Sequence, residues 1–62
     1  MDRTERFYKI NQLLENHRHV SFARMREALE VSRATLQRDL EYMRTRLNAP
    51  IVWDREIGRA HV

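Results

Sequence analysis

The chain has 62 residues and a formal net charge of +3 at pH 7, from 12 Lys and Arg residues against 9 Asp and Glu residues. It contains no cysteine and a single glycine, which excludes disulfides, thiolate metal sites, cysteine nucleophiles and glycine-rich phosphate loops. The longest apolar run, Ile51-Val52-Trp53, is far too short to span a membrane. Composition therefore predicts a small, helix-rich, cytoplasmic protein without a cofactor.

Arginine dominates the positive charge. Every cation except Lys9 is an arginine, and the sequence pI is about 10.2. A pI this high is typical of nucleic-acid-binding domains, and the guanidinium fork binds phosphates and guanine edges in a bidentate way that lysine cannot match. No repeat, low-complexity tract or linker divides the chain, so residues 1–62 are expected to form one domain.

A first helix is predicted from about Arg3 to Asn16. Asp2 and Glu5 have the spacing of a capping box, which satisfies the free amide groups at a helix start. One face of this helix carries apolar residues at helical spacing, namely Phe7, Ile10, Leu13 and Leu14.

A second, shorter helix is predicted from about Phe22 to Leu29. Ser21 is its expected N-cap, and Val20 before it suits a very short strand. The apolar face is expected to consist of Phe22, Met25, Ala28 and Leu29.

A third helix is predicted to start after a tight break at Glu30-Val31, with Ser32 as its N-cap. Asn48 can cap its end, and Pro50 stops any continuation. Its expected buried stripe has spacings of four, three and four residues and consists of Leu36, Leu40, Met43 and Leu47.

The C-terminal segment favours a β-hairpin. Residues 51–54 alternate as a strand does, 55–58 suit a turn, and 59–62 suit a return strand. We interpret residues 57–62 as a truncated wing or an appended tail. The sequence thus predicts a mainly α (α+β) fold, a three-helix winged helix-turn-helix with a small C-terminal β-wing.

Two helices joined by a short turn, the second longer and more basic, form a helix-turn-helix, in which the second helix enters the DNA major groove. At 100° per residue, the predicted buried stripe of the third helix turns the opposite face outward. The first two outer turns combine arginines, an amide and a methyl group, which suit guanine, adenine and thymine. The predicted base-reading residues are Ser32, Arg33, Ala34, Thr35, Gln37 and Arg38.

The segment from Met25 to Arg44 resembles the winged helix-turn-helix of DeoR-type bacterial repressors, and most closely the N-terminal domain of WYL-domain transcriptional regulators. The resemblance covers about Thr4 to Glu56 and is carried by Val31-Ser32-x-x-Thr35-Leu36-x-Arg38-Asp39-Leu40 and by Ala49-Pro50-Ile51-Val52 with Asp54-Arg55. It implies a bacterial, nucleoid-associated regulator whose recognition helix reads bases and whose wing contacts DNA through Arg55. The family commonly has glycine where Glu30 stands, and its ligand-sensing domain is absent from this sequence.

Further contacts to the DNA backbone are predicted from Ser21, Arg24, Arg44 and Arg55. Simpler roles exist for two of these residues. Ser21 is explained by capping alone, and Arg44, like Arg46, favours the dipole at a helix C-terminus.

Other functions have weaker support in the sequence. His17, His19 and His61 lack the ligand pattern of a metal site, and Ser21 and Ser32 are explained as caps, so we expect neither a metal nor an enzyme. Binding of single-stranded nucleic acid needs exposed aromatic residues, for which Trp53 and Tyr42 are the candidates in the sequence, although packing explains Trp53 better.

The sequence therefore predicts sequence-specific binding of double-stranded DNA by a transcriptional regulator, with repression as the expected role. Because one small domain binds DNA weakly, we expect a homodimer, which a C-terminal domain absent from this sequence would assemble. The alternative is a winged-helix protein–protein interaction module, which would present a contiguous apolar patch on the third helix.

Overall fold

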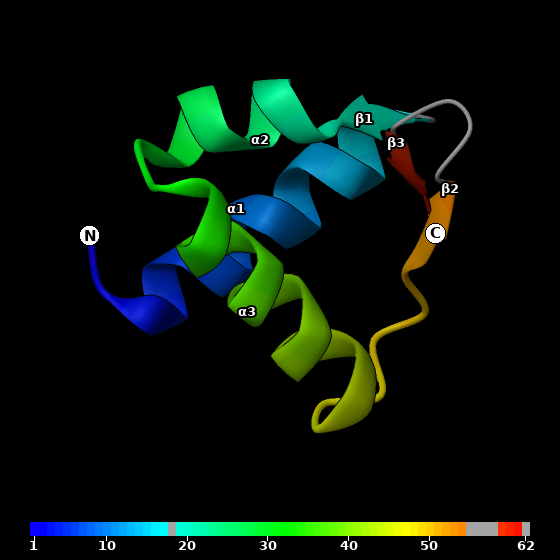
Figure 1. The fold of residues 1–62 in the computed structure, drawn as a ribbon. Coiled ribbons are helices and arrows are strands. Elements are labelled where there is room, and N and C mark those ends of the chain that lie inside the picture. Colours follow the sequence, from blue (N-terminus) through cyan, green and yellow to red (C-terminus); the bar gives the residue numbers. More distant parts are fainter. Residues whose placement is uncertain (18, 55–58, 62) are drawn as a thin grey trace.

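The computed structural model describes residues 1–17, 19–54 and 59–61. Three helices pack together, and a small sheet lies at one side of them (Figure 1). The elements follow the chain in the order α1 (Arg3–Asn16), β1 (Val20–Ser21), α2 (Phe22–Leu29), α3 (Arg33–Thr45), β2 (Val52–Asp54) and β3 (Arg59–His61). The predicted winged helix-turn-helix is confirmed.

The sheet is antiparallel and has the order β1-β3-β2. β3 is therefore the middle strand, with Ala60 opposite Val20 on one side and opposite Trp53 on the other. The two strands of the predicted hairpin pair with each other, and β3 also pairs with the two residues that lead into α2. The predicted turn at 55–58 lies outside the described residues. This pairing ties the start of α2 to the far end of the chain.

Each helix begins at a residue whose side chain accepts a hydrogen bond from a free amide of the first turn. Asp2 accepts from the Glu5 N–H at 2.8 Å, and Ser21 accepts from the Arg24 N–H at 3.1 Å. Ser32 accepts from the Thr35 N–H at 3.2 Å. These three caps were predicted from sequence, and each stabilises its helix by about 1 kcal/mol.

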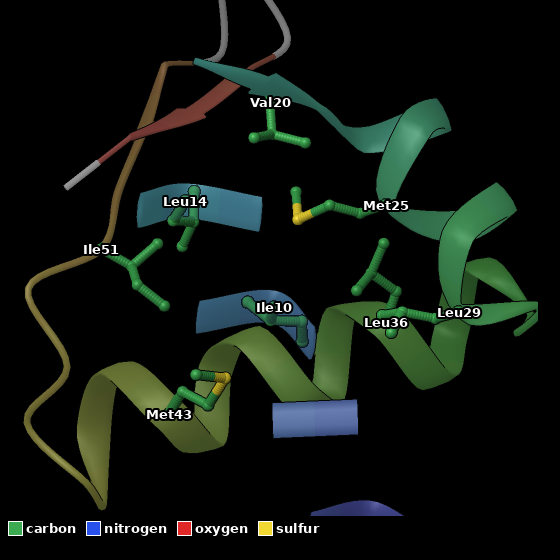
Figure 2. Close-up of a cluster of buried hydrophobic side chains, with 8 residues drawn as sticks. All are labelled: Ile10, Leu14, Val20, Met25, Leu29, Leu36, Met43 and Ile51. Carbon is green, nitrogen blue, oxygen red and sulfur yellow. The ribbon is translucent and has the colours of Figure 1, made fainter. Parts of the chain in front are cut away.

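The core lies where the three helices and the sheet meet (Figure 2). Its side chains come from every helix, from β1 and from the segment before β2. The buried members are Ile10, Leu14, Val20, Met25, Leu29, Leu36, Met43 and Ile51. Burying a side chain of this size stabilises a fold by roughly 1.5–3 kcal/mol, so these residues hold α2 and α3 in their relative orientation.

The structure corrects three predicted core positions. Leu47 is 52% exposed, because α3 ends at Thr45 and the chain then leaves the helical path. Asn48 adopts a left-handed conformation (φ 53°), and the Ala49 N–H donates to the Met43 carbonyl at 2.9 Å. Leu40 is half-buried, and Ala28 is exposed beside Lys9 and other polar residues of α1.

Candidate nucleic-acid interface

The connection between α2 and α3 consists of residues 30–32. Glu30 ends α2 in a left-handed conformation (φ 54°, ψ 46°), which reverses the chain direction sharply. The Val31 N–H donates to the Arg26 carbonyl at 3.4 Å, which closes the turn. Ser32 then caps α3, so this short connection provides hydrogen bonds for free backbone groups at the end of α2 and the start of α3.

The first turn of α3 contains a small hydroxyl network. The Ser32 hydroxyl accepts from the Thr35 N–H and donates to the Thr35 hydroxyl oxygen at 3.0 Å. The Ser32 proton is therefore used within the turn, whereas Thr35 can still donate its own proton outward. Of these two predicted base-reading residues, Ser32 is exposed and Thr35 is half-buried.

The outward face of α3 is exposed, as the helical projection predicts. In its first two turns this face carries Arg33, Ala34, Gln37 and Arg38. The Arg33 guanidinium lies 5.8 Å from the centre of the Phe22 ring, at the start of α2. Among the described residues, no carboxylate lies within ion-pair distance of Arg38. In the part of the chain that the structure describes, neither Arg33 nor Arg38 has a paired carboxylate, so this face presents two positive charges beside the Gln37 amide.

The second half of the same face is electrically neutral. Arg44 donates to the Glu41 carboxylate at 2.8 Å, and both side chains are more than half exposed. The Thr45 hydroxyl donates to the Glu41 backbone carbonyl at 2.7 Å. Arg44, which was predicted to contact the DNA backbone, thus forms an ion pair with Glu41.

The remaining predicted backbone contacts lie at or beyond the ends of other elements. Ser21 is half-buried in β1 and its hydroxyl is occupied by the Arg24 amide, while the Arg24 side chain is exposed in the first turn of α2. Arg55 lies outside the described residues. The structure therefore brings Ser21 and Arg24 together at one helix start and leaves the predicted wing contact undescribed.

A comparison with protein families decides what this arrangement is. The model of a family described as an HTH domain matches residues 5–58, which include nearly all of α1, both later helices and β2. The chain belongs to this HTH domain family. It is thus a helix-turn-helix DNA-binding domain, with α2 and α3 as the two helices of the motif. No curated protein and no solved structure matched the chain.

A partly buried ion pair, which sequence reasoning missed, supports α3 of this HTH domain. Asp39 follows Arg38 and is only 3% exposed. Arg6 of α1 donates to both of its oxygens, from Nε at 2.6 Å and from Nη2 at 3.2 Å. The hydrogen bond with Asp39 raises the pKa of Arg6 above its ordinary value. The pair fixes α3 against α1.

A second contact between α1 and α3 in the HTH domain involves aromatic rings. The rings of Phe7 and Tyr42 stack with centroids 5.6 Å apart, and the Arg3 guanidinium lies 3.8 Å from the Tyr42 centroid. Tyr42 is thus occupied and is not a free platform for a base. Sequence reasoning overlooked one exposed aromatic residue, since Tyr8 on α1 is 64% exposed. The side chain of Trp53 lies outside the part of the molecule that the structure describes.

Two further findings concern other classes of site. Within residues 1–17, 19–54 and 59–61, no group of three His, Cys, Asp or Glu side chains could hold a metal ion. In the same part of the chain, every helix is too short or too polar to cross a membrane.

Proposed function

We propose that this HTH domain recognises specific sequences in double-stranded DNA, with α3 lying in the major groove. The observation that carries the proposal is the exposed first half of α3, where Arg33, Gln37 and Arg38 share one face. The major groove is about 12 Å wide and admits one helix, whose N-terminal turns contact base edges. Arginine and glutamine are the side chains that bind guanine and adenine edges with two hydrogen bonds.

Contacts to the DNA backbone would set the register of α3. The exposed Arg24 lies in the first turn of α2, where free amides also favour a phosphate. Ser21, Arg44 and the wing residue Arg55 complete the proposed backbone set, in which Arg44 is the weakest member because its guanidinium is paired with Glu41. These contacts supply salt-dependent affinity but no sequence preference.

We further propose that the domain belongs to a bacterial transcriptional regulator of the DeoR or WYL type and acts in repression. The motif around Ser32 and Asp39 supports this assignment. A single domain contacts few phosphates, so the regulator would bind as a homodimer on two half-sites, spaced by one helical turn of about 10 base pairs or its multiples. The proposal assigns the domain no reaction and no cofactor.

The outward face of α3 argues against the alternative, a protein-docking module. Large exposed apolar side chains among the described residues are Met1, Tyr8, Leu47 and Val52. None of them lies on α3, so the face lacks the contiguous apolar patch that a docking helix needs.

Selection from a library of randomised duplexes, followed by titration, tests the proposal. We expect the domain to enrich a short common sequence, and to bind a duplex with that sequence at least tenfold more tightly than a scrambled duplex of equal composition. Affinity for both should fall steeply between about 50 and 200 mM salt. Equal affinity for the two duplexes, or affinity independent of salt, would refute sequence-specific DNA recognition.

A further inference from the structure

Glu41 pairs with Arg44 on the exposed side of α3, beyond the residues proposed to read bases. Both side chains are more than half exposed, at 60% for Glu41 and 55% for Arg44. Exposed ion pairs between residues three apart on a helix add little to stability. The main physical effect of the pair is therefore on the charge that this side of α3 presents to a binding partner.

Position along the helix separates this pair from the reading arginines. Glu41 lies three residues after Arg38 on the same exposed face, and Arg44 lies three residues further. The first half of the face carries Arg33 and Arg38 without a paired carboxylate among the described residues, whereas the second half has no net charge from the pair. Within α3 itself, the arginines without a paired carboxylate among the described residues thus lie in the first half, and Arg46 adds an exposed positive charge at the C-cap.

We propose that Glu41 is a specificity-determining residue that restrains Arg44 and so suppresses binding to unrelated DNA sequences. This inference rests on the proposed function of α3. Each cation that neutralises a phosphate strengthens binding to any sequence. A carboxylate that forms an ion pair with such a cation, and that also repels phosphates, reduces this sequence-independent affinity.

The effect should be larger on unrelated DNA than on the preferred sequence. On unrelated DNA the domain is free to shift until its cations meet phosphates, so a released Arg44 gains a contact. On the preferred sequence the base contacts fix the register, and Arg44 gains a phosphate only if one lies within reach. Specificity is a difference between affinities, and it rises when the weaker complex is penalised.

The test compares E41Q with the unchanged domain on the selected and scrambled duplexes across a range of salt concentrations. E41Q should bind the scrambled duplex about five to ten times more tightly near 0.1 M salt, and the slope of log affinity against log salt should steepen by about 0.9. Affinity for the selected duplex should rise less, so the ratio between the two falls severalfold. In an R44Q background, most of the gain from E41Q should disappear.

E27Q is the matched control, because Glu27 is an exposed glutamate on α2 and the substitution removes the same charge. If E27Q tightens scrambled binding as much as E41Q does, the effect is one of net charge and the inference is overturned. It is also overturned if E41Q leaves the ratio unchanged, or if it weakens binding to the selected duplex, which would make Glu41 a base contact. If the unchanged domain fails to discriminate the duplexes at all, the proposed function fails and this inference falls with it.

Discussion

Arg38 and Asp39 are adjacent in the sequence, yet their side chains have opposite environments. Arg38 is exposed on the outward face of α3, whereas Asp39 is buried and holds the guanidinium of Arg6. Successive positions on a helix differ by 100°, so one charged residue can face DNA while the next one anchors the helix. Substitution of Arg38 should therefore change DNA binding, whereas substitution of Asp39 should change the stability of the fold.

The consequence for Arg38 concerns sequence discrimination. Arg38→Ala should weaken binding to the selected duplex by roughly 1–3 kcal/mol and should relax the preference at one base position. Arg26→Ala is the matched control, because Arg26 is an exposed arginine of α2 outside the proposed contact set. Titrations of both variants on selected and scrambled duplexes check this. Undiminished discrimination by the Arg38→Ala domain would remove this residue from the reading set.

Glu30 has a different consequence, for stability. It adopts a left-handed conformation (φ 54°). This conformation is energetically unfavourable for residues that have a Cβ atom, whereas glycine adopts it at almost no cost. Glu30→Gly should therefore stabilise the fold by about 1 kcal/mol, which raises the Tm by roughly 4–8 °C in a domain of this size.

Asn48 provides the control for Glu30, because it is also left-handed (φ 53°) but asparagine tolerates that conformation. Asn48→Gly should raise the Tm less than Glu30→Gly does. Thermal unfolding followed by circular dichroism measures both. A lower Tm for Glu30→Gly would contradict the assigned role of this turn.

At the scale of elements, the starts of the helices were predictable and the inner face of α3 was predictable only in part. Ser21 and Ser32 mark helix starts because a hydroxyl can accept from a free amide, which is a local property. The burial predicted for Leu47 assumed that α3 continues past Thr45, and the left-handed Asn48 shows where it does not.

The burial of Asp39 could have been suspected from the sequence, but its ion-pair partner could not have been identified. It lies three residues after Leu36 and four before Met43, which places a carboxylate beside the buried stripe. A carboxylate there requires a partner. Its partner Arg6 is 33 residues away in the sequence, and no local pattern indicates which arginine approaches.

This ion pair predicts a stability effect that links α1 to α3. Asp39→Ala should destabilise the fold by about 2–3 kcal/mol, because it removes two charge-assisted hydrogen bonds and leaves Arg6 unpaired. Glu27→Ala, which removes an exposed carboxylate from α2, should change stability by no more than about 0.5 kcal/mol. Urea unfolding of both variants measures this, and equal stabilities would show that the pair does not hold α3.

At the scale of the whole molecule, the sheet was predictable as a hairpin but not as a three-stranded unit. The alternation in 51–54 and the return at 59–61 indicate a hairpin from neighbouring residues. The pairing of Val20 with Ala60 joins positions that are far apart in the sequence, and a two-residue strand carries too little pattern to specify a partner. This pairing determines where the start of α2, with Ser21 and Arg24, lies relative to the rest of the domain.

The proposed interface as a whole combines the start of α2 with the first half of α3. Helix α1 contacts α3 through the Arg6–Asp39 ion pair and through Arg3, which lies over the Tyr42 ring. Sequence patterns predicted the chemistry of the outward face, because its residues lie on a single helix. They did not reveal that the hydroxyls of Ser32 and Thr35 bond each other, nor that Glu41 pairs with Arg44. Those contacts depend on which rotamers the folded turn permits.

The central claim is that the first half of α3 faces DNA. Amide chemical-shift mapping by NMR, with the domain titrated by its selected duplex, tests it most directly. We expect the largest shifts within residues 32–38 and around Arg24, and we expect them to weaken in the Arg38→Ala variant. Largest shifts on the exposed side of α1, around Lys9, Gln12 and Asn16, with α3 unperturbed, would contradict it.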